Sequence, residues 1–173
     1  EPPMARRIVS VTTLTTPVAY IDTTNLTSAT FPFLIQGGST TQVNKIWELS
    51  LNGQAASSSS PTFFILSRDS TIGTTNSNGA GQTDAAMAPS TAALTNPPLT
   101  GNTNTTLPQR LSTLHLANCS LNAFGGVYFW RANRLEECFS VLGNGTTFGE
   151  ASLSAFSGGT PGATGAHMIY ETI

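Results

Sequence analysis

The amino-acid sequence predicts an all-β fold, an antiparallel β-sandwich of jelly-roll type with about ten strands and one long loop excursion. Short runs rich in β-branched and aromatic residues recur along the 173 residues and are bounded by Gly, Pro and Asn. No segment sustains the i, i+3, i+4, i+7 apolar spacing of an amphipathic helix. The abundant Thr, Ser, Val, Gly and Pro are poor helix formers, which also favours two packed sheets.

The N-terminal part of the chain contains five of the predicted strands, at 8–14, 18–22, 31–36, 43–51 and 62–68. Side chains alternate along 43–51, with Trp47, Leu49 and Leu51 on one face and polar residues between them. Such alternation is typical of a strand with one buried face, so we expect Trp47 in the core. The continuous apolar run of 62–68 predicts a strand that is buried on both faces.

Residues 70–108 differ from the predicted strands in composition. Thr, Asn, Ser, Gly, Ala and Pro dominate there, and 82–87 is compatible with a short helix. A structureless loop of this length is rare inside a compact domain unless it is functional or lies on a partner. Two interpretations stay open, an excursion over the surface that reaches an adjacent subunit and a flexible loop.

Five further strands are predicted, at 111–121, 127–131, 137–142, 150–156 and 167–171. Tyr128 and Trp130 share one face of their strand and are expected to pack in the core. We therefore predict one domain over residues 8–173, with 70–108 as its surface excursion and 1–7 as an N-terminal arm. Met4 followed by Ala5 is typical of a translation start, with residues 1–3 as an addition; the alternative is a trimmed precursor.

The chain is unusually poor in charge. Charged residues make up 9% of it and the formal net charge is −2, whereas a typical chain has about 25% charged residues. A surface of hydroxyls and amides is easier to desolvate than one of Lys and Glu, which favours a subunit packed against neighbours. Arg6 and Arg7 form the only adjacent basic pair, so nucleic acid is not expected as a main partner. Two explanations of this pair stay open. It lies in a solvated arm, or it makes a weak contact to nucleic acid or to an acidic neighbouring subunit. No run of 18 apolar residues exists, so no membrane partner is expected.

No residue is predicted to be catalytic, cofactor-binding or metal-binding. His115 alternates with leucines and is expected on the more polar face of its strand; it and His167 would each need a Ser and an Asp beside them to form a triad. Cys119 and Cys138 lie in apolar runs and are expected as buried free thiols, although a bridge between neighbouring strands stays open. Neither cysteine has a nearby His cluster for zinc. The four sequons, at Asn25, Asn104, Asn118 and Asn144, are expected by chance in a chain rich in Asn and Thr.

The carboxylates are few and scattered. Glu136 and Glu137 are adjacent and would face opposite sides of a strand. Glu150 and Glu171 are candidates for neighbouring strands, but we expect each to pair with an Arg or to be exposed rather than to form a glycosidase pair. The aspartates are isolated, which predicts no calcium loop. They are Asp22, Asp69 and Asp84.

The C-terminal third resembles small virion proteins of tailed bacteriophages, of the capsid decoration and minor structural type. The resemblance is carried by GGVYFWR at 125–131, GEASLS at 149–154, GGTPG at 158–162 and HMIYE at 167–171. It implies a β-sandwich or jelly roll that assembles with symmetry and lacks catalysis. It transfers no functional residue.

The sequence thus predicts a non-enzymatic structural protein on the exterior of a virus capsid, made in the host cytoplasm. The expected partners are copies of itself, the major capsid protein, or both. The alternative is a carbohydrate-binding or adhesive module of the fibre-head type, with a glycan as partner, and no cofactor is expected in either case. An enzyme is the weakest hypothesis, because it would need a cleft that brings a histidine beside a carboxylate.

Overall fold

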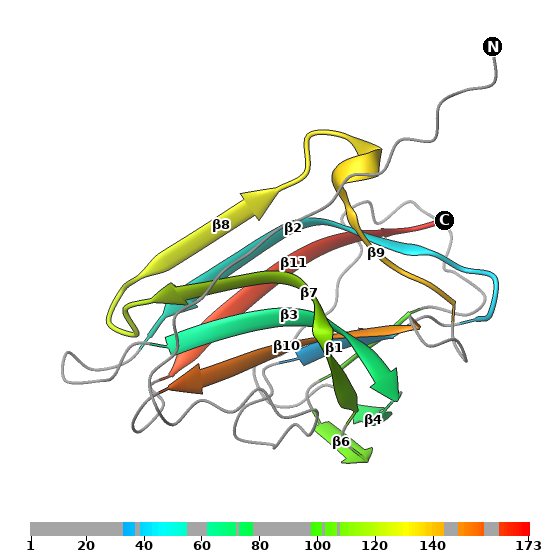
Figure 1. The fold of residues 1–173 in the computed structure, drawn as a ribbon, viewed down its shortest axis with the longest axis horizontal. Helices are drawn as coiled ribbons and strands as arrows, with labels where there is room; N and C mark the ends of the chain where they lie inside the picture. Colours follow the sequence, from blue (N-terminus) through cyan, green and yellow to red (C-terminus); the bar gives the residue numbers. More distant parts are fainter. Residues whose placement is uncertain are drawn as a thin grey trace.

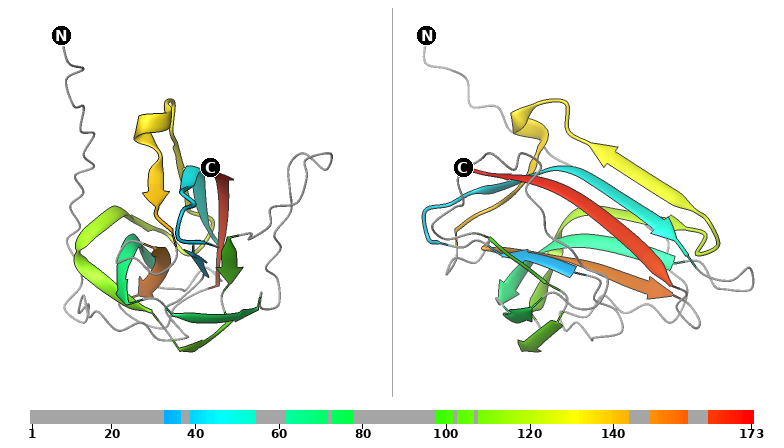
Figure 2. Two further views of the ribbon diagram at one scale, coloured as in Figure 1. Left: turned by 90° about the vertical axis from the view of Figure 1, so that its right-hand side faces the viewer. Right: turned by 180° about the vertical axis from the view of Figure 1, so that it is seen from behind.

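A computed structural model describes nine segments of the chain, residues 33–36, 39–54, 62–71, 73–77, 98–101, 103–106, 108–143, 149–157 and 163–173. The strands expected at 8–14 and 18–22 and the short helix at 82–87 lie outside these residues. The described residues form eleven strands and one 3-10 helix, η2 (Leu135–Glu137). Two antiparallel sheets face each other and make the body of the molecule (Figures 1 and 2). The prediction of an all-β sandwich is confirmed at this level.

The first sheet, sheet A, has five strands in the order β5-β1-β10-β3-β7. They are β5 (Leu99–Gly101), β1 (Phe33–Gln36), β10 (Glu150–Ser157), β3 (Thr62–Thr71) and β7 (Gln109–Leu121). Every pairing between them is antiparallel. Residues 62–67 of β3 are all buried, so the predicted burial of this strand on both faces is confirmed.

The second sheet, sheet B, is built on the long strand β2 (Asn44–Gly53). β11 (Thr164–Thr172) pairs with one side of β2. β8 (Val127–Arg131) and β9 (Phe139–Val141) pair with successive parts of the other side. The remaining strands, β4 (Thr74–Ser77) and β6 (Thr103–Thr106), form a small separate sheet. The described parts of the segment 70–108 thus include strands β4, β5 and β6, where the sequence suggested a loop.

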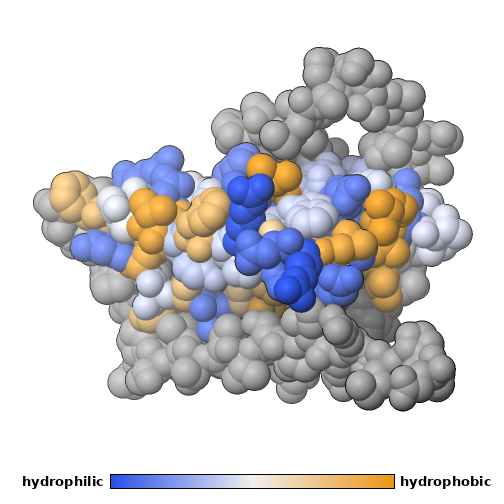
Figure 3. Space-filling view, turned by 90° about the horizontal axis from the view of Figure 1, so that it is seen from above, coloured by the Kyte–Doolittle hydropathy of each residue, from blue (hydrophilic) through white to orange (hydrophobic). Residues whose placement is uncertain are grey.

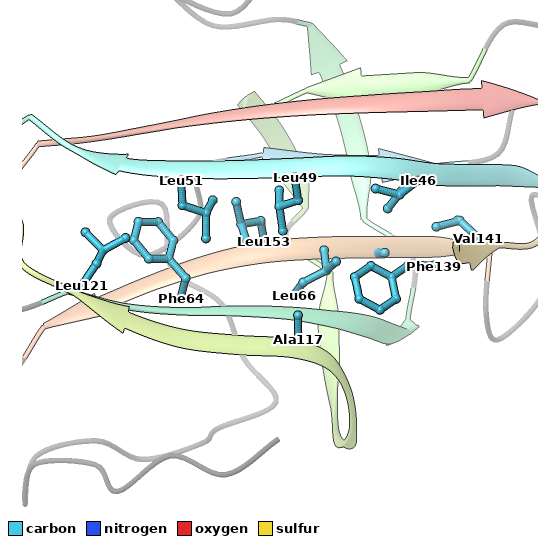
Figure 4. Packing of buried hydrophobic residues seen from close by; sticks show 11 residues of the cluster. Ile46, Leu49, Leu51, Phe64, Leu66, Ala117, Leu121, Phe139, Val141 and Leu153 are labelled. Carbon is cyan, nitrogen blue, oxygen red and sulfur yellow. The ribbon is translucent and has the colours of Figure 1, made fainter. Parts of the chain in front are cut away.

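The core lies between sheets A and B (Figure 4). Strand β2 contributes Ile46, Leu49 and Leu51, each at most 1% exposed, and β3 and β10 contribute side chains from the opposite sheet. The latter are Phe64, Leu66, Ala151 and Leu153. Tyr128 and Trp130 pack against this cluster, and the Trp130 ring stacks on Phe139 with centroids 4.1 Å apart. The predicted packing of the β8 aromatics in the core is therefore confirmed.

The prediction that Trp47 shares the core with Leu49 is wrong, because β2 contains a bulge. Glu48 pairs with Ile169 and Ile46 with Tyr170, which leaves Trp47 without a partner in β11. The extra residue shifts the alternation, so that Ile46 and Leu49 both point inward. Trp47 is half-buried instead, and its indole N–H donates to Glu171 Oε2 at 3.0 Å.

Candidate functional site

The face of sheet A that points away from the sandwich core carries several polar side chains that are buried. Successive side chains of a strand point to opposite faces, so the residues that alternate with Leu66 and Leu153 lie on this outer face. Ser67 and Ser152 are paired there and have no exposed surface. One rung further along lie Asp69, Glu150 and Arg110, also with no exposed surface. Three ionisable side chains in a chain with so few charges thus converge at one buried place.

Register explains why these three residues meet. Ala151 of β10 pairs with Arg68 of β3, so their neighbours Glu150 and Asp69 come side by side on the outer face. Asp69 pairs in turn with Arg110 of β7, at a point where the β3–β7 register is irregular. Strand β3 therefore holds the aspartate between the glutamate on one side and the arginine on the other. We call Asp69, Arg110 and Glu150 the buried triad.

Hydrogen bonds hold the two carboxyl groups of the triad. The Ser152 hydroxyl donates to Asp69 Oδ1 at 2.6 Å. The Gly73 amide donates to both Glu150 oxygens, at 3.3 Å to Oε1 and 3.2 Å to Oε2. The Asp69 and Glu150 side chains also lie close enough to affect each other's pKa, and a hydrogen bond between them requires that one of the two carboxyl groups carries a proton.

Burial raises the pKa of both carboxyl groups. Loss of solvent raises the pKa of Asp69 to about 6, against the opposing effect of its hydrogen bonds and of the Arg110 charge. Loss of solvent, the hydrogen bond to Asp69 and the charge of Asp69 raise the pKa of Glu150 to about 9. At neutral pH Glu150 is therefore protonated and Asp69 ionised, and the Asp69 charge balances Arg110. The triad carries no net charge, which is the form in which a buried ionic group costs least.

The triad can hold a proton, but it offers no contact to a substrate in this structure. Two carboxyl groups with separated pKa values are typical of acid–base catalysis. Catalysis also needs contact between these groups and a reacting molecule, and none of the three side chains has any exposed surface. The arrangement therefore supports a role in fixing β10, β3 and β7 against one another.

The two histidines are not brought together. His115 pairs with Ser67 on the polar face of sheet A, the side on which it was expected. His167 is exposed on β11, opposite Ser50 of sheet B. The structure thus places them in different sheets.

The expected exposure of Glu171 is confirmed, whereas the predicted placements of Glu150, Glu136 and Glu137 are wrong. Glu150 is buried in sheet A, whereas Glu171 pairs with Lys45 in sheet B, so the two do not lie on neighbouring strands. Glu136 and Glu137 lie in η2 rather than in a strand, because the chain turns there between β8 and β9. The Glu137 carboxylate accepts a hydrogen bond from the Asn133 amide at 2.9 Å and so closes this turn.

The cysteines are free thiols, as predicted, and no bridge links them. Cys119 is half-buried in β7, and loss of solvent raises the pKa of its thiol to about 11. Cys138 is buried after η2. Among the described residues no three His, Cys, Asp or Glu side chains form a group that could hold a metal ion. Asp22, Asp84 and the Arg6–Arg7 pair lie outside those residues.

The triad is the feature that sequence reasoning missed, because Asp69 was judged isolated and Glu150 was expected to be exposed or paired with an arginine. A signal for it exists in the sequence. Asp69 directly follows the run 62–68, which was predicted to be buried on both faces, and it alternates with Ser67 and Ile65. A charged residue that continues a fully buried strand needs a partner on each neighbouring strand.

Strand β8 lies at the rim of sheet B and exposes apolar side chains. Val127 is 72% exposed and Phe129 is 57% exposed, while Tyr128 and Trp130 between them face the core. Among the described residues no strand pairs with the side of β8 that points away from β2 (Figure 1). Figure 3, which looks down on this side of the molecule, shows separate hydrophobic areas with hydrophilic side chains between them.

The backbone of β8 presents a defined set of groups at its free edge. Gly53 donates to the Gly126 carbonyl and Ala132 donates to the Trp47 carbonyl, both on the β2 side. Hydrogen-bonded and non-hydrogen-bonded pairs alternate along an antiparallel ladder. The N–H and C=O groups of the odd-numbered residues of β8 therefore point outward. They belong to Val127, Phe129 and Arg131.

In the part of the chain that the structure describes, no helix is long and apolar enough to cross a membrane. Comparison with protein-family models, with curated proteins and with solved structures finds no match to this chain.

Proposed function

We propose that this protein is a non-enzymatic structural subunit of a virus particle, a capsid decoration or shell-building protein that works through symmetric contacts. Its partners are copies of itself, the major capsid protein, or both, and its place is the exterior of the capsid after assembly in the host cytoplasm. The finer architecture that we propose is a jelly roll. Its support is that the chain passes repeatedly from one sheet to the other, as from β1 to β2, from β2 to β3 and from β7 to β8.

The observation that carries the proposal is the scarcity of charge at the surface. The sequence has only seven basic and nine acidic residues, and three of these form the buried triad. Exposed charge keeps soluble proteins apart, and its desolvation opposes association. A surface of hydroxyl and amide groups with exposed Val127 and Phe129 suits a protein that is covered by neighbours in its working state.

Imaging of the purified chain tests this proposal. We expect electron microscopy and mass photometry over a range of concentrations to show oligomers, rings or closed particles. A protein that stays a monomer at every concentration would contradict the proposal. Among the described residues β5, β7, β8 and β11 all lie at sheet edges, so more than one contact is open to the subunit and the test does not depend on any single surface.

A carbohydrate-binding or adhesive module is the second candidate, and one observation favours it. Phe124 and Phe129 are both 57% exposed, and aromatic rings at a surface can stack on the apolar faces of sugars. A glycan array with the intact protein decides between the candidates. Binding that is lost in a Phe124→Ala, Phe129→Ala double variant would favour the module, and no binding would leave the structural role.

A further inference from the structure

We propose that the free edge of β8 pairs with β8 of a second copy about a two-fold axis, which joins two copies of sheet B into one continuous sheet. This inference rests on the proposed function and names one of the contacts by which the subunit would assemble. The occupant is a second copy of this chain because the backbone groups of this edge complement themselves and its charges are compatible with that pairing.

The backbone register of such a pair is set by which residues face outward. Val127, Phe129 and Arg131 carry the outward N–H and C=O groups, since Gly126 and Ala132 bond to β2. A two-fold axis at Phe129 pairs it with the same residue of the second copy and pairs Val127 with Arg131. All three outward residues then form hydrogen-bonded pairs, which satisfies every free donor and acceptor of β8.

An axis shifted by one residue leaves some backbone N–H and C=O groups of β8 without partners. If the axis passed through Tyr128, Arg131 would have to pair with Gly125 of the second copy. Gly125 lies in the turn before β8 with a φ of +79°. This conformation is left-handed rather than extended, so Gly125 cannot continue a ladder. An axis through Trp130 would pair Val127 with Asn133, whose N–H already donates to Glu137 of its own chain, so the register centred on Phe129 is the one that the strand favours.

The charges of the edge are compatible with the same register. Arg131 is the only charged residue of β8, and its guanidinium lies 3.9 Å from Glu48 of β2 in its own chain. In the proposed pair Arg131 lies opposite Val127 of the second copy. The two arginines are then separated along the strands by four residues, about 13 Å, which exceeds the screening length of about 8 Å at physiological ionic strength. Each ion pair is kept, and like charges do not meet.

The side chains on the outer face add an apolar contact. Phe129 lies opposite Phe129 of the second copy, and Val127 packs beside the aliphatic part of Arg131. Aromatic pairs across an antiparallel ladder are among the stabilising cross-strand contacts. The exposure of Val127 and Phe129 in the single chain, 72% and 57%, has a physical reason if this face is covered in the assembly.

Light scattering on the full chain and two lysine variants tests the contact. We expect wild type to show species of at least twice the 18.0 kDa chain mass. Phe129→Lys places two ammonium groups opposite each other at the axis and should abolish this contact. Phe124→Lys is the matched control, because Phe124 has the same 57% exposure but lies in the turn outside the paired residues. It should leave the wild-type mass unchanged.

Cysteine cross-linking tests the register independently of any loss of assembly. Paired residues in a hydrogen-bonded position have Cα atoms about 5.5 Å apart, which suits a disulfide. A Val127→Cys, Arg131→Cys double variant should therefore form a covalent dimer under mild oxidation, whereas Val127→Cys alone should not. Wild type serves as the background for native Cys119 and Cys138.

The outcomes separate this inference from the proposed function. Assembly of wild type that persists in Phe129→Lys, or equal cross-linking by single and double cysteine variants, would overturn the β8 pairing and leave a structural role through another surface. A wild-type chain that is monomeric at every concentration would overturn both. The pairing is supported if Phe129→Lys loses assembly while Phe124→Lys keeps it, and if the double cysteine variant cross-links while Val127→Cys does not.

Discussion

Replacing Glu150 with glutamine should make the protein more stable at neutral pH, although it removes a buried hydrogen-bonded side chain. The glutamine side chain has nearly the same shape. Its amide NH₂ can donate to Asp69 as the protonated carboxyl does, and its carbonyl oxygen can accept from the Gly73 amide. What changes is the titration, because a glutamine cannot ionise in either the folded or the unfolded chain.

The size of the effect follows from linkage between proton binding and folding. The folded chain holds Glu150 with a pKa of about 9, whereas its ordinary value is 4.5. A raised carboxyl pKa gives stability that is fully present below the unfolded value and is lost as pH rises toward the folded value. The free energy of unfolding of wild type should therefore fall by about 1.4 kcal/mol per pH unit through neutral pH from this group alone. At pH 7 the need to keep Glu150 protonated lowers the free energy of unfolding of wild type by about 3 kcal/mol. Glu150→Gln should remove this penalty.

Urea and thermal unfolding at pH 5, 7 and 8.5 measure this difference. We expect the gap between Glu150→Gln and wild type to widen steadily with pH, and at pH 7 to reach roughly 6–12 °C in midpoint temperature. Glu136→Gln is the matched control, since Glu136 is exposed in η2 and should leave the pH dependence as in wild type. Parallel wild-type and Glu150→Gln curves across this range would refute the assignment of the shared proton.

Further predictions concern the other half of the triad, two glycines and one thiol. Asp69→Asn should destabilise the fold by about 3–5 kcal/mol at pH 7 in urea unfolding, because it leaves the Arg110 charge without its partner carboxylate; a neutral effect would contradict the charge balance. Gly53→Ala should lower the midpoint temperature more than Gly125→Ala, because a Cβ at Gly53 falls on the backbone of the β7–β8 turn, whereas Gly125 has open space and carries only the cost of its positive φ. The Cys119 thiol, with its pKa raised to about 11, should react with a thiol reagent at pH 8 far more slowly in the folded than in the urea-unfolded protein, and equal rates would show that the folded strand exposes it.

The architecture was largely readable from the sequence, and the bulge and the triad were not. Short runs of β-branched and aromatic residues bounded by turn residues located eight strands: β1, β2, β3, β7, β8, β9, β10 and β11. The sequence analysis placed Trp47 on the wrong face of β2. One extra residue at the bulge inverts the alternation, and the composition of the strand does not reveal it. Short strands such as β5, with three residues, carry no period at all.

The triad depends on register between strands that are far apart in the chain. Asp69, Arg110 and Glu150 come from three strands, and nothing local in the sequence says that β3 lies between β7 and β10. The apolar run 62–68 indicated the burial of β3, but the partners of a buried charge are set by strand pairing. The exposed edge of β8 was hidden for the same reason, since an edge strand and a central strand can have the same alternation.

The position of β10 in sheet A has a consequence for synthesis of the chain. β10 lies between β1 and β3 in space, although it follows both of them in the chain. β11, later still, covers one side of β2 in sheet B. A ribosome must therefore release β10 before sheet A can close and β11 before sheet B can close, and until β10 emerges the apolar β3 is without one of its neighbours. Pairing between strands far apart in the chain forms slowly, and an apolar strand without its neighbours is prone to aggregate until that pairing is made.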